Sequence, residues 1–449
     1  MGPEWIAIIA LVALFVIGTL LPINMGALAY VAAWLVGMYS LGLDEKEILG
    51  GISADLVLTL IGVTYLFAIA RQNGTVDLIV RTAVSSVGGR VALIPWVMFA
   101  VTAVITAIGA ASPAACAIIG PIALGFAGRY GISPLMMGMM VVHGAQAGGF
   151  SPISIYGTIT NSVMEDAGLG SSHLTIFLSS LLVNTVMAAI LFVVLGGRKL
   201  VTMRMDADGE LVSAGGGTAA VGGPRRPDRS DARSATGATP TTGTPNPDDA
   251  GSRLEHVLTL LAFLAVAVVA LAFDKNIGFA AITAAVVLSI LTPKAYKDTV
   301  KQIAWPTVLL VAGVSTYATI LTTAGSPEFV GNWAAGLGAA AIGALILCYV
   351  GGVVSAFASS TALLPVIVPI AIPLVAEGGL SAGLFVAALA VSSTIVDVSP
   401  FSTNGALMLA NKPDTIDENT YYKQILAYGA IVTLVGPLLV WAALVLPGW

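Results

Sequence analysis

Charged residues are scarce in this chain. Only 10% of its 449 residues are Asp, Glu, Lys or Arg, whereas 57% are hydrophobic and the mean hydropathy is +0.94. This composition excludes a soluble globular domain, and we expect no nucleic-acid partner. The lipid bilayer is therefore the main solvent of the protein, and we expect an all-α polytopic membrane protein.

Cysteine is scarce as well. Cys116 and Cys348 both fall inside apolar segments, where a buried, unpaired thiol is expected. No disulfide or metal framework follows from two such residues.

No ATP-binding pattern is visible, and we expect no cofactor. The chain enters its first apolar segment at Trp5 without a basic stretch or a small-residue cleavage site, so we expect a retained helix there.

Apolar runs close to the ~20 residues that cross a hydrocarbon core dominate the two halves of the sequence. One further segment, residues 76–87, is amphipathic and is expected to lie along the membrane interface. In the first half we predict helices near 4–22, 25–43, 55–71 and 172–196, an interrupted run over 91–127 and a broken helix over 134–165. In the second half we predict helices near 254–273, 277–292, 304–323 and 421–447, an interrupted run over 338–375 and a broken helix over 381–410.

Residues 203–252 have a different composition. They are rich in Gly, Thr, Pro, Ala, Asp and Arg and contain almost no large apolar residues. This composition predicts a disordered linker. The chain therefore divides into a first repeat (1–202), a linker (203–252) and a second repeat (253–449).

The two halves repeat one another at an offset of 248 residues. The residues that recur are helix breakers and hydroxyls inside membrane-length apolar runs. Paired interruptions of this kind indicate the binding site of a secondary transporter, because unwound backbone at membrane depth must line a cavity. The recurring pairs include Ser112 and Ser360, Pro121 and Pro369, Ser151 and Ser399, Pro152 and Pro400, Ser154 and Ser402, and Gly157 and Gly405.

The distribution of basic residues indicates how the halves are inserted. If both interrupted runs are re-entrant hairpins, each half has five crossings and the repeats are inverted. Nine basic residues of short loops then lie on one side, against only Lys46 and Lys275 on the other. The positive-inside rule makes the first side cytoplasmic. We therefore expect a multi-pass protein of the cell (inner) membrane, with a cytoplasmic linker and both termini outside.

Four breaks are predicted to converge on the substrate site: the two hairpin tips and the two broken helices. Free amides at half-helix N-termini favour anions, while freed carbonyls and hydroxyls favour Na⁺, so the pattern predicts an anion carried with cations. Tyr156 matches Asn404 in position, and both side chains could donate to a carboxylate. The predicted substrate-binding residues are Ser112, Pro113, Ser151, Pro152, Ser154, Ser360, Thr361, Ser399, Pro400, Ser402, Thr403 and Asn404.

A second set of residues is predicted to bind or couple the cation. Asp397 is a carboxylate well inside a predicted span, and we expect it to bind Na⁺ or carry a proton, with a structural helix cap as the alternative. Its counterpart is Gly149, so the symmetry is broken here. His143 precedes the first break. Its side chain has two alternative roles: contact with a proton or the substrate, or an interhelical hydrogen bond. Ser359 at the second tip completes the set, and no metal beyond Na⁺ is predicted.

At these residues the sequence resembles the ion transporter superfamily that contains the divalent anion/sodium symporters, and most closely its malonate and dicarboxylate carrier branch, the MatC-like proteins. Gly148 to Gly157 and Asp397 to Leu407 look like the signature stretches of that branch. The resemblance spans both halves. It implies a homodimer in which a transport domain moves as an elevator against a scaffold, with the first two helices of each half contributing to the scaffold.

The resemblance also implies roles for the hairpin tips. In the related symporters each tip carries Ser-Asn-Thr, whose backbone and side chains bind Na⁺ and the substrate carboxylate. The matching triplets here, 112–114 and 360–362, read Ser-Pro-Ala and Ser-Thr-Ala, and a shift by one residue gives Ser-Ser-Thr at the second tip. Both tips lack the asparagine, although coordination by the backbone could remain.

These observations together predict a secondary active transporter that imports malonate or a C4-dicarboxylate, with Na⁺ as the coupling ion and H⁺ as the alternative. A Na⁺/H⁺ antiporter or another inorganic-ion carrier of the same superfamily would use the same architecture. A membrane-embedded serine hydrolase built on His143, Ser151 and Asp397 is a remote alternative, because it leaves the duplicated breaks unexplained. We therefore do not expect an enzyme.

Overall fold

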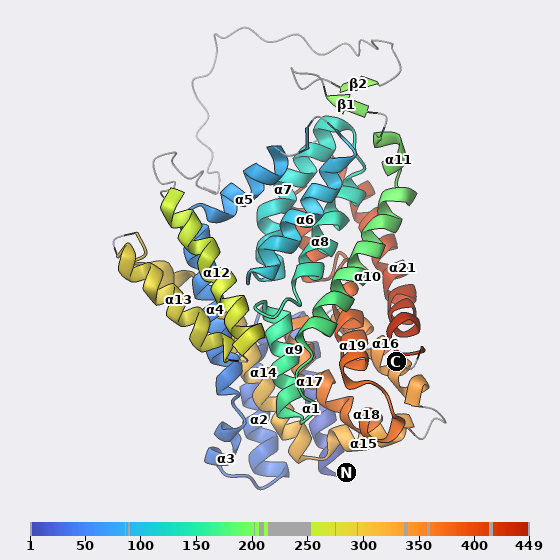
Figure 1. Ribbon diagram of the computed structural model, residues 1–449. Helices are drawn as coiled ribbons and strands as arrows, with labels where there is room; N and C mark the ends of the chain where they lie inside the picture. The colour runs from blue at the N-terminus through green and yellow to red at the C-terminus, as the bar shows by residue number, and fades with distance from the viewer. Residues whose placement is uncertain are drawn as a thin grey trace, which may run out of the picture.

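The computed structural model describes residues 2–85, 87–88, 90–201, 203–205, 211–213, 253–273, 275–293, 295–335, 340–356, 360–412 and 416–447. Most of these residues are helical (Figure 1). The first half contains α1 (Pro3–Leu20), α2 (Met25–Ser40), α3 (Glu45–Gly50), α4 (Ala54–Gln72), α5 (Thr75–Ser85), α6 (Leu93–Ala107), α7 (Ser112–Tyr130), α8 (Pro134–Gly148), α9 (Ile155–Asp166), α10 (His173–Val194) and α11 (Gly197–Leu200).

The second half repeats most of this order. Seven helices of the described residues are long and apolar enough to cross a membrane, and several shorter apolar helices accompany them, as a polytopic membrane protein requires. The second half contains α12 (Arg253–Phe273), α13 (Ile277–Leu291), the 3₁₀ helix η2 (Thr299–Gln302), α14 (Trp305–Thr323), α15 (Ser326–Ala335), α16 (Ala340–Ser355), α17 (Ser360–Ile370), α18 (Ile372–Gly378), α19 (Ala382–Ile395), α20 (Thr403–Ala410) and α21 (Glu418–Leu444).

Each helix expected from the sequence is present, with ends within three residues of the prediction. The interruptions also fall where they were predicted: α6 and α7 are separate, α8 ends before the Ser151-Pro152 break, and α19 ends before the Ser399-Pro400 break. The sequence did not predict α3, which is too short for a periodic pattern and is fixed by a capping box between Asp44 and Glu47.

The sequence also did not predict α15, although the repeat contains the signal for it. Gly74 and Gly325 follow the third long helix of each half, and both adopt a left-handed backbone, with φ of 77° and 74°. Glycine adopts this conformation without the steric cost that a Cβ adds. Each glycine turns the chain into a short helix, α5 in the first half and α15 in the second.

The predicted linker contains one short piece of regular structure. Strands β1 (Met203–Met205) and β2 (Leu211–Ser213) pair antiparallel, with Met203 opposite Ser213 and Met205 opposite Leu211. The prediction of disorder is therefore wrong for these six residues, where apolar side chains return between the polar ones. The rest of the linker prediction lies outside the described residues.

The two halves interlock through their second and third long helices. Helix α4 packs on α13, and α14 packs on α2, so each contact joins one half to the other. Glycines allow both crossings. A Cβ on Gly62 would lie 2.7 Å from the carbonyl oxygen of Gly278, and one on Gly313 would overlap the backbone of Gly26. Small residues at these crossings bring the helix backbones into direct contact, as is common between membrane helices.

The helix caps repeat the same exchange between halves. Asn24 caps α2 by accepting a hydrogen bond from Gly26 N and donates to the carbonyl oxygen of Pro306, in the first turn of α14. Asn276 caps α13 in the same way and donates to the carboxylate of Asp55, in the first turn of α4. In each half, one asparagine therefore caps its own helix and donates a hydrogen bond to the third long helix of the other half.

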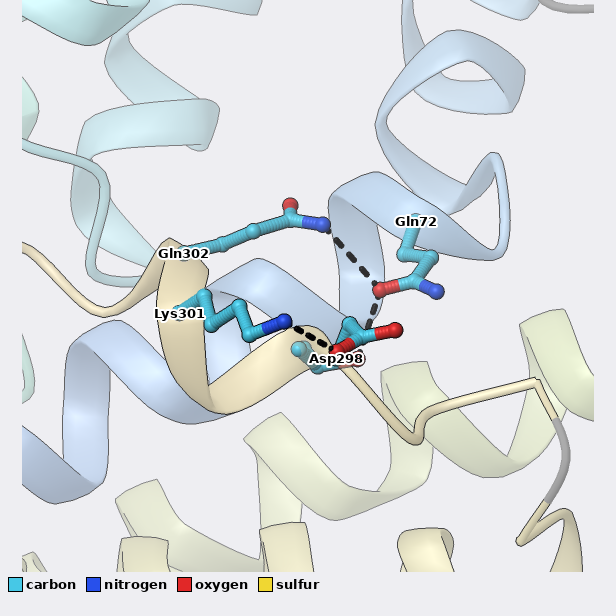
Figure 2. Close-up of polar contacts among 5 residues, drawn as sticks. Gln72, Asp298, Lys301 and Gln302 are labelled. Carbon is cyan, nitrogen blue, oxygen red and sulfur yellow. Dashed lines mark hydrogen bonds and ion pairs between the residues drawn. The ribbon is translucent and has the colours of Figure 1, made fainter.

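A third contact joins the end of α4 to η2. The Gln72 Oε1 atom accepts hydrogen bonds from Thr299 Oγ1 at 2.5 Å and from Gln302 Nε2 at 3.2 Å (Figure 2). Beside it, Lys301 Nζ pairs with Asp298 at 2.6 Å, which raises the pKa of the exposed ammonium group (Figure 2). The hydrogen bonds of Gln72 contribute more to this contact than the ion pair does, because an exposed ion pair adds little to stability.

The helices form two packed groups. We call α1, α2, α4, α12, α13 and α14 the interlocked group, since the crossings described above join four of them, while α1 packs on α2 and α12 packs on α13. The second group consists of α6–α10, α16, α17 and α19–α21, in which α8 packs on α6, α7 and α10, and α19 packs on α10, α16 and α21. The groups meet mainly where α17 contacts α14 and where α9 contacts α4. We call this the group boundary.

Candidate functional site

A cavity of about 330 Å³ lies at the group boundary, beside the broken segments. The first hairpin tip, the first break and the starts of α17 and α20 form most of its wall, and the start of α14 closes it from the interlocked group. Its lining residues are Ala110, Ala111, Ser112, Pro113, Ala114, Gly149, Ile155, Tyr156, Ala304, Pro306, Thr307, Leu310, Thr361 and Thr403.

Five residues predicted from the sequence line this cavity together: Ser112, Pro113, Gly149, Thr361 and Thr403. No residue of α14 is among those predicted from the sequence to form the site. Repeat symmetry could not have found this wall, because α14 is a long helix without a paired break. The start of α14 reaches the cavity only because α14 packs on α2 and α17 in the folded chain.

A chain of hydrogen bonds links the second break to the first hairpin tip. Asn404 donates from Nδ2 to Asp397 Oδ2 at 2.8 Å and to Ser112 Oγ at 2.7 Å, and its backbone N–H donates to Asp397 Oδ1 at 3.1 Å. All three side chains are buried. The Ser112 hydroxyl that accepts from Asn404 belongs to the lining of the cavity.

The repeat makes the two breaks chemically different. Where the second break has Asp397 and Asn404, the first has Gly149 and Tyr156. A Cβ on Gly149 would lie 2.9 Å from Tyr156 Cδ2, so the absent side chain leaves space for the ring. The first break is therefore filled by an aromatic ring and the second by a carboxylate–amide pair.

Two pairs of serines hold the breaks by bonding to backbone. Ser151 donates to the Ala107 carbonyl at 2.5 Å, and Ser399 donates to the Ala356 carbonyl at 3.0 Å, so each break is tied to the first arm of its hairpin. Ser154 and Ser402 donate at 2.7 Å to the carbonyls of Ser151 and Ser399, respectively. These hydroxyls satisfy carbonyls that the interrupted helices leave free, as the membrane interior requires. None of these four residues lines the cavity.

The second hairpin is closed by serines. Ser360 Oγ lies 2.7 Å from Ser355 Oγ and donates to the Ser393 carbonyl at 3.2 Å. Thr361 follows directly and lines the cavity. The remaining predicted residue of this tip, Ser359, lies outside the described residues. Pro152 and Pro400 each follow the serine of their break and stand away from the cavity lining.

His143 lies away from the cavity, between α8, α10 and α21. Its Nδ1 is 2.9 Å from Asn184 Oδ1, and its Nε2 is 2.6 Å from the Tyr428 hydroxyl. The ring is completely buried. This geometry favours the interhelical hydrogen-bond interpretation of the histidine. Gln146, one turn further along α8, is completely buried, and its side-chain nitrogen and oxygen have no hydrogen-bond partner among the described residues.

The electrostatics of the cavity favour an anion. Helices α7, α9, α17 and α20 all begin beside it, which places the positive ends of four helix dipoles there, and the Asn404 amide at the start of α20 is already bonded to Asp397. No lysine or arginine is among the lining residues, so hydroxyls and helix starts supply the donors. The described residues contain no group of three or more His, Cys, Asp or Glu side chains that could hold a metal ion.

Comparison with known protein families identifies the class of protein. Residues 1–149 match the family model of the dicarboxylate carrier protein MatC N-terminus, and residues 269–448 match that of a citrate transporter. Together the two matches support a MatC-like dicarboxylate carrier of the ion transporter superfamily. The carrier is thus a multi-pass secondary transporter of dicarboxylate-type anions and not an enzyme. No curated protein matches it. The first match ends at Gly149, inside the first break, and the second contains the whole second hairpin and break.

The contacts of Asn404 allow a direct test of the site. We expect Asn404→Ala to raise the KM for dicarboxylate uptake by about tenfold, because a charge-assisted hydrogen bond of about 1.5–3 kcal/mol is lost beside the cavity. Asn184→Ala is the matched control, since Asn184 is equally buried but bonds His143, away from the cavity. The measurement is the initial uptake rate in proteoliposomes over a range of substrate concentrations. An equal rise of KM in both variants would contradict the assignment.

Proposed function

We propose that the carrier imports a small dicarboxylate, malonate or a C4-dicarboxylate, by symport with Na⁺. The single observation that supports this most strongly is the cavity on which four helix starts converge. Its volume of about 330 Å³ corresponds to roughly ten water molecules at ~30 Å³ each. This space suits a small organic anion held by hydroxyls and backbone amides.

Charge balance supports coupling to a cation. The cavity has no basic side chain in its lining, and Asp397 already places one carboxylate behind it. A divalent anion would add two further negative charges in a region of low dielectric, where uncompensated charge is costly. A cation bound together with the substrate offsets this charge, which makes co-transport more favourable than transport of the anion alone.

Oxygen atoms beside Asp397 support Na⁺ over H⁺. Asn404 Oδ1 is buried and has no hydrogen-bond partner among the described residues, and it belongs to the amide group that bonds Asp397. Carboxylate and amide carbonyl oxygens are ligands of hard cations. We therefore assign the cation to the second break, next to Asp397 and Asn404. In this proposal Ser112 and Thr361 contact the substrate, and Gly149 and Tyr156 complete the wall beside them.

We further propose that the two halves are inverted repeats and that the second group moves as an elevator against the interlocked group. The exchange of helix contacts between halves supports the repeat. In Figure 1 the first hairpin (α6, α7) lies in the upper part of the molecule, and the second (α16, α17) lies in the lower part. The elevator is supported by the cavity itself, because one wall belongs to α14 and the others belong to the second group. By family resemblance we expect the carrier to be a homodimer.

The proposed orientation places the linker in the cytoplasm and both termini outside the cell membrane. In Figure 1, α1 begins and α21 ends in the lower half of the view, whereas β1 and β2 lie at the top. Lys46→Cys and Lys297→Cys, both at exposed residues, test this. A membrane-impermeant maleimide should label the first in intact cells and the second only after permeabilisation. The natural cysteines, Cys116 and Cys348, are buried and should give little background. Labelling of Lys297→Cys in intact cells would overturn the orientation.

Coupling and substrate are tested by uptake into proteoliposomes. We expect an inward Na⁺ gradient to drive uptake of labelled malonate or succinate more strongly than an inward H⁺ gradient. Asp397→Asn should lower this uptake by at least about tenfold, a loss of ~1.4 kcal/mol. Asp417→Asn is the control, because Asp417 is an exposed carboxylate that caps α21. If an H⁺ gradient alone drives uptake equally well, the coupling ion is H⁺ and not Na⁺. Absence of malonate, succinate and citrate flux, with Na⁺/H⁺ exchange present, would show the antiporter instead.

The elevator is tested at the group boundary. Asp55 on α4 accepts a hydrogen bond from Ser162 on α9 at 2.9 Å, and it also accepts one from Asn276 on α13. A disulfide in Asp55→Cys/Ser162→Cys would join the two groups and should reduce uptake to background until a reductant is added. The same cross-link in Asp55→Cys/Asn276→Cys joins only the interlocked group and should leave uptake unchanged. Full transport by the oxidised first pair would exclude sliding of α9 along α4.

A further inference from the structure

A second, larger cavity of about 630 Å³ lies between α1 of the interlocked group and the second hairpin. Helix α1 lines it from Ile8 to Leu20, a length of ~18 Å at 1.5 Å per residue. Helices α15, α16 and α17 form the opposite walls, and α14 contributes to the floor. We call this cavity the apolar recess.

The recess has few hydrogen-bond partners for water. Its lining side chains are apolar apart from the hydroxyls of Thr19 and Ser326 and the indole N–H of Trp333, and no charged residue lines it. Thr19 Oγ1 already donates to Phe15 O at 2.7 Å, and Ser326 Oγ donates to Glu4 O at 3.1 Å. Buried water needs two to four polar partners, whereas apolar cavities stay dry. An empty space of this size would forfeit the dispersion contacts of every side chain around it.

We propose that the apolar recess is a binding site for a phospholipid acyl chain. The walls belong to membrane helices, so hydrocarbon chains are the apolar molecules that surround them. The ~18 Å length of the α1 wall is close to half of the ~30 Å hydrocarbon core, which is the depth of one leaflet. Trp333 of α15 lies at the rim and is 56% exposed, as expected of an aromatic residue at the membrane interface.

An acyl chain fits the recess better than a second copy of the protein does. The floor includes Leu321, Leu347 and Leu363, each of which is 3–4% exposed and lies behind the more exposed Val12 and Val353 of the rim. A flexible chain can pass between α1 and α16 to reach this floor, whereas the face of a rigid helix would contact the rim alone. The lipid would therefore occupy the space between an interlocked-group helix and the second hairpin.

Lipid retention tests the proposal without reference to the transported substrate. Native mass spectrometry of the full-length protein, purified in a mild detergent, should show a retained phospholipid. Val353→Trp fills the recess and should lower the retained fraction by at least about fivefold. Val193→Trp is the matched control, since both valines are 47% exposed but Val193 lies on α10, outside the recess. Val12→Trp fills the recess from the opposite wall and should repeat the loss.

The position of the lipid is tested by photolabelling in liposomes. Phosphatidylethanolamine with a diazirine in its acyl chain should label peptides of α1 and α16, and Val353→Trp should reduce this labelling while Val193→Trp retains it. The proposal is overturned if no phospholipid is retained, or if both valine variants retain it equally. Formation of an intermolecular disulfide by Val12→Cys would also overturn it, because a second copy of the chain would then cover the recess.

Discussion

The fold depends on one constraint: the hydrocarbon interior offers no hydrogen bonds, so a helix that stops at membrane depth must have its free backbone groups satisfied by the protein. Ser151 and Ser399 meet this requirement by bonding the first arm of each hairpin, at Ala107 and Ala356. The same bonds fix the hairpin tips against the breaks. The cavity therefore forms where the backbone is interrupted, and four helices begin beside it.

The repeat gives the site two breaks of the same kind, and the residues that differ between these breaks give the site its chemistry. A symmetric carrier would present two equivalent breaks. Here the first break has Gly149 and Tyr156, and the second has Asp397 and Asn404. The tyrosine ring fills the space that the glycine leaves, while the carboxylate holds an amide that reaches across to Ser112. One repeat thus shapes the cavity, and the other supplies the charged group.

The two groups of helices are joined in different ways. Within the interlocked group, glycine crossings bring backbones into contact, and asparagine caps reach from one half to the other. Across the boundary, the described contacts are fewer and include the single hydrogen bond between Asp55 and Ser162. Helices of both groups line the cavity beside the breaks, and helices of both groups line the apolar recess. Contacts of this kind suit a boundary along which one group slides.

The sequence by itself determined the membrane class, the helix ends and the positions of the breaks, because hydrophobic length, proline, glycine and repeated spacing act locally. It also selected Ser112, Gly149, Thr361 and Thr403, which meet in the cavity. Only the tertiary structure decided that Ser151, Ser154, Ser399 and Ser402 bond backbone, that His143 bonds Asn184 and Tyr428, and that α14 closes the site. A hydroxyl that supports a break and one that faces a substrate look alike in sequence, since the difference lies in which distant segment packs beside them.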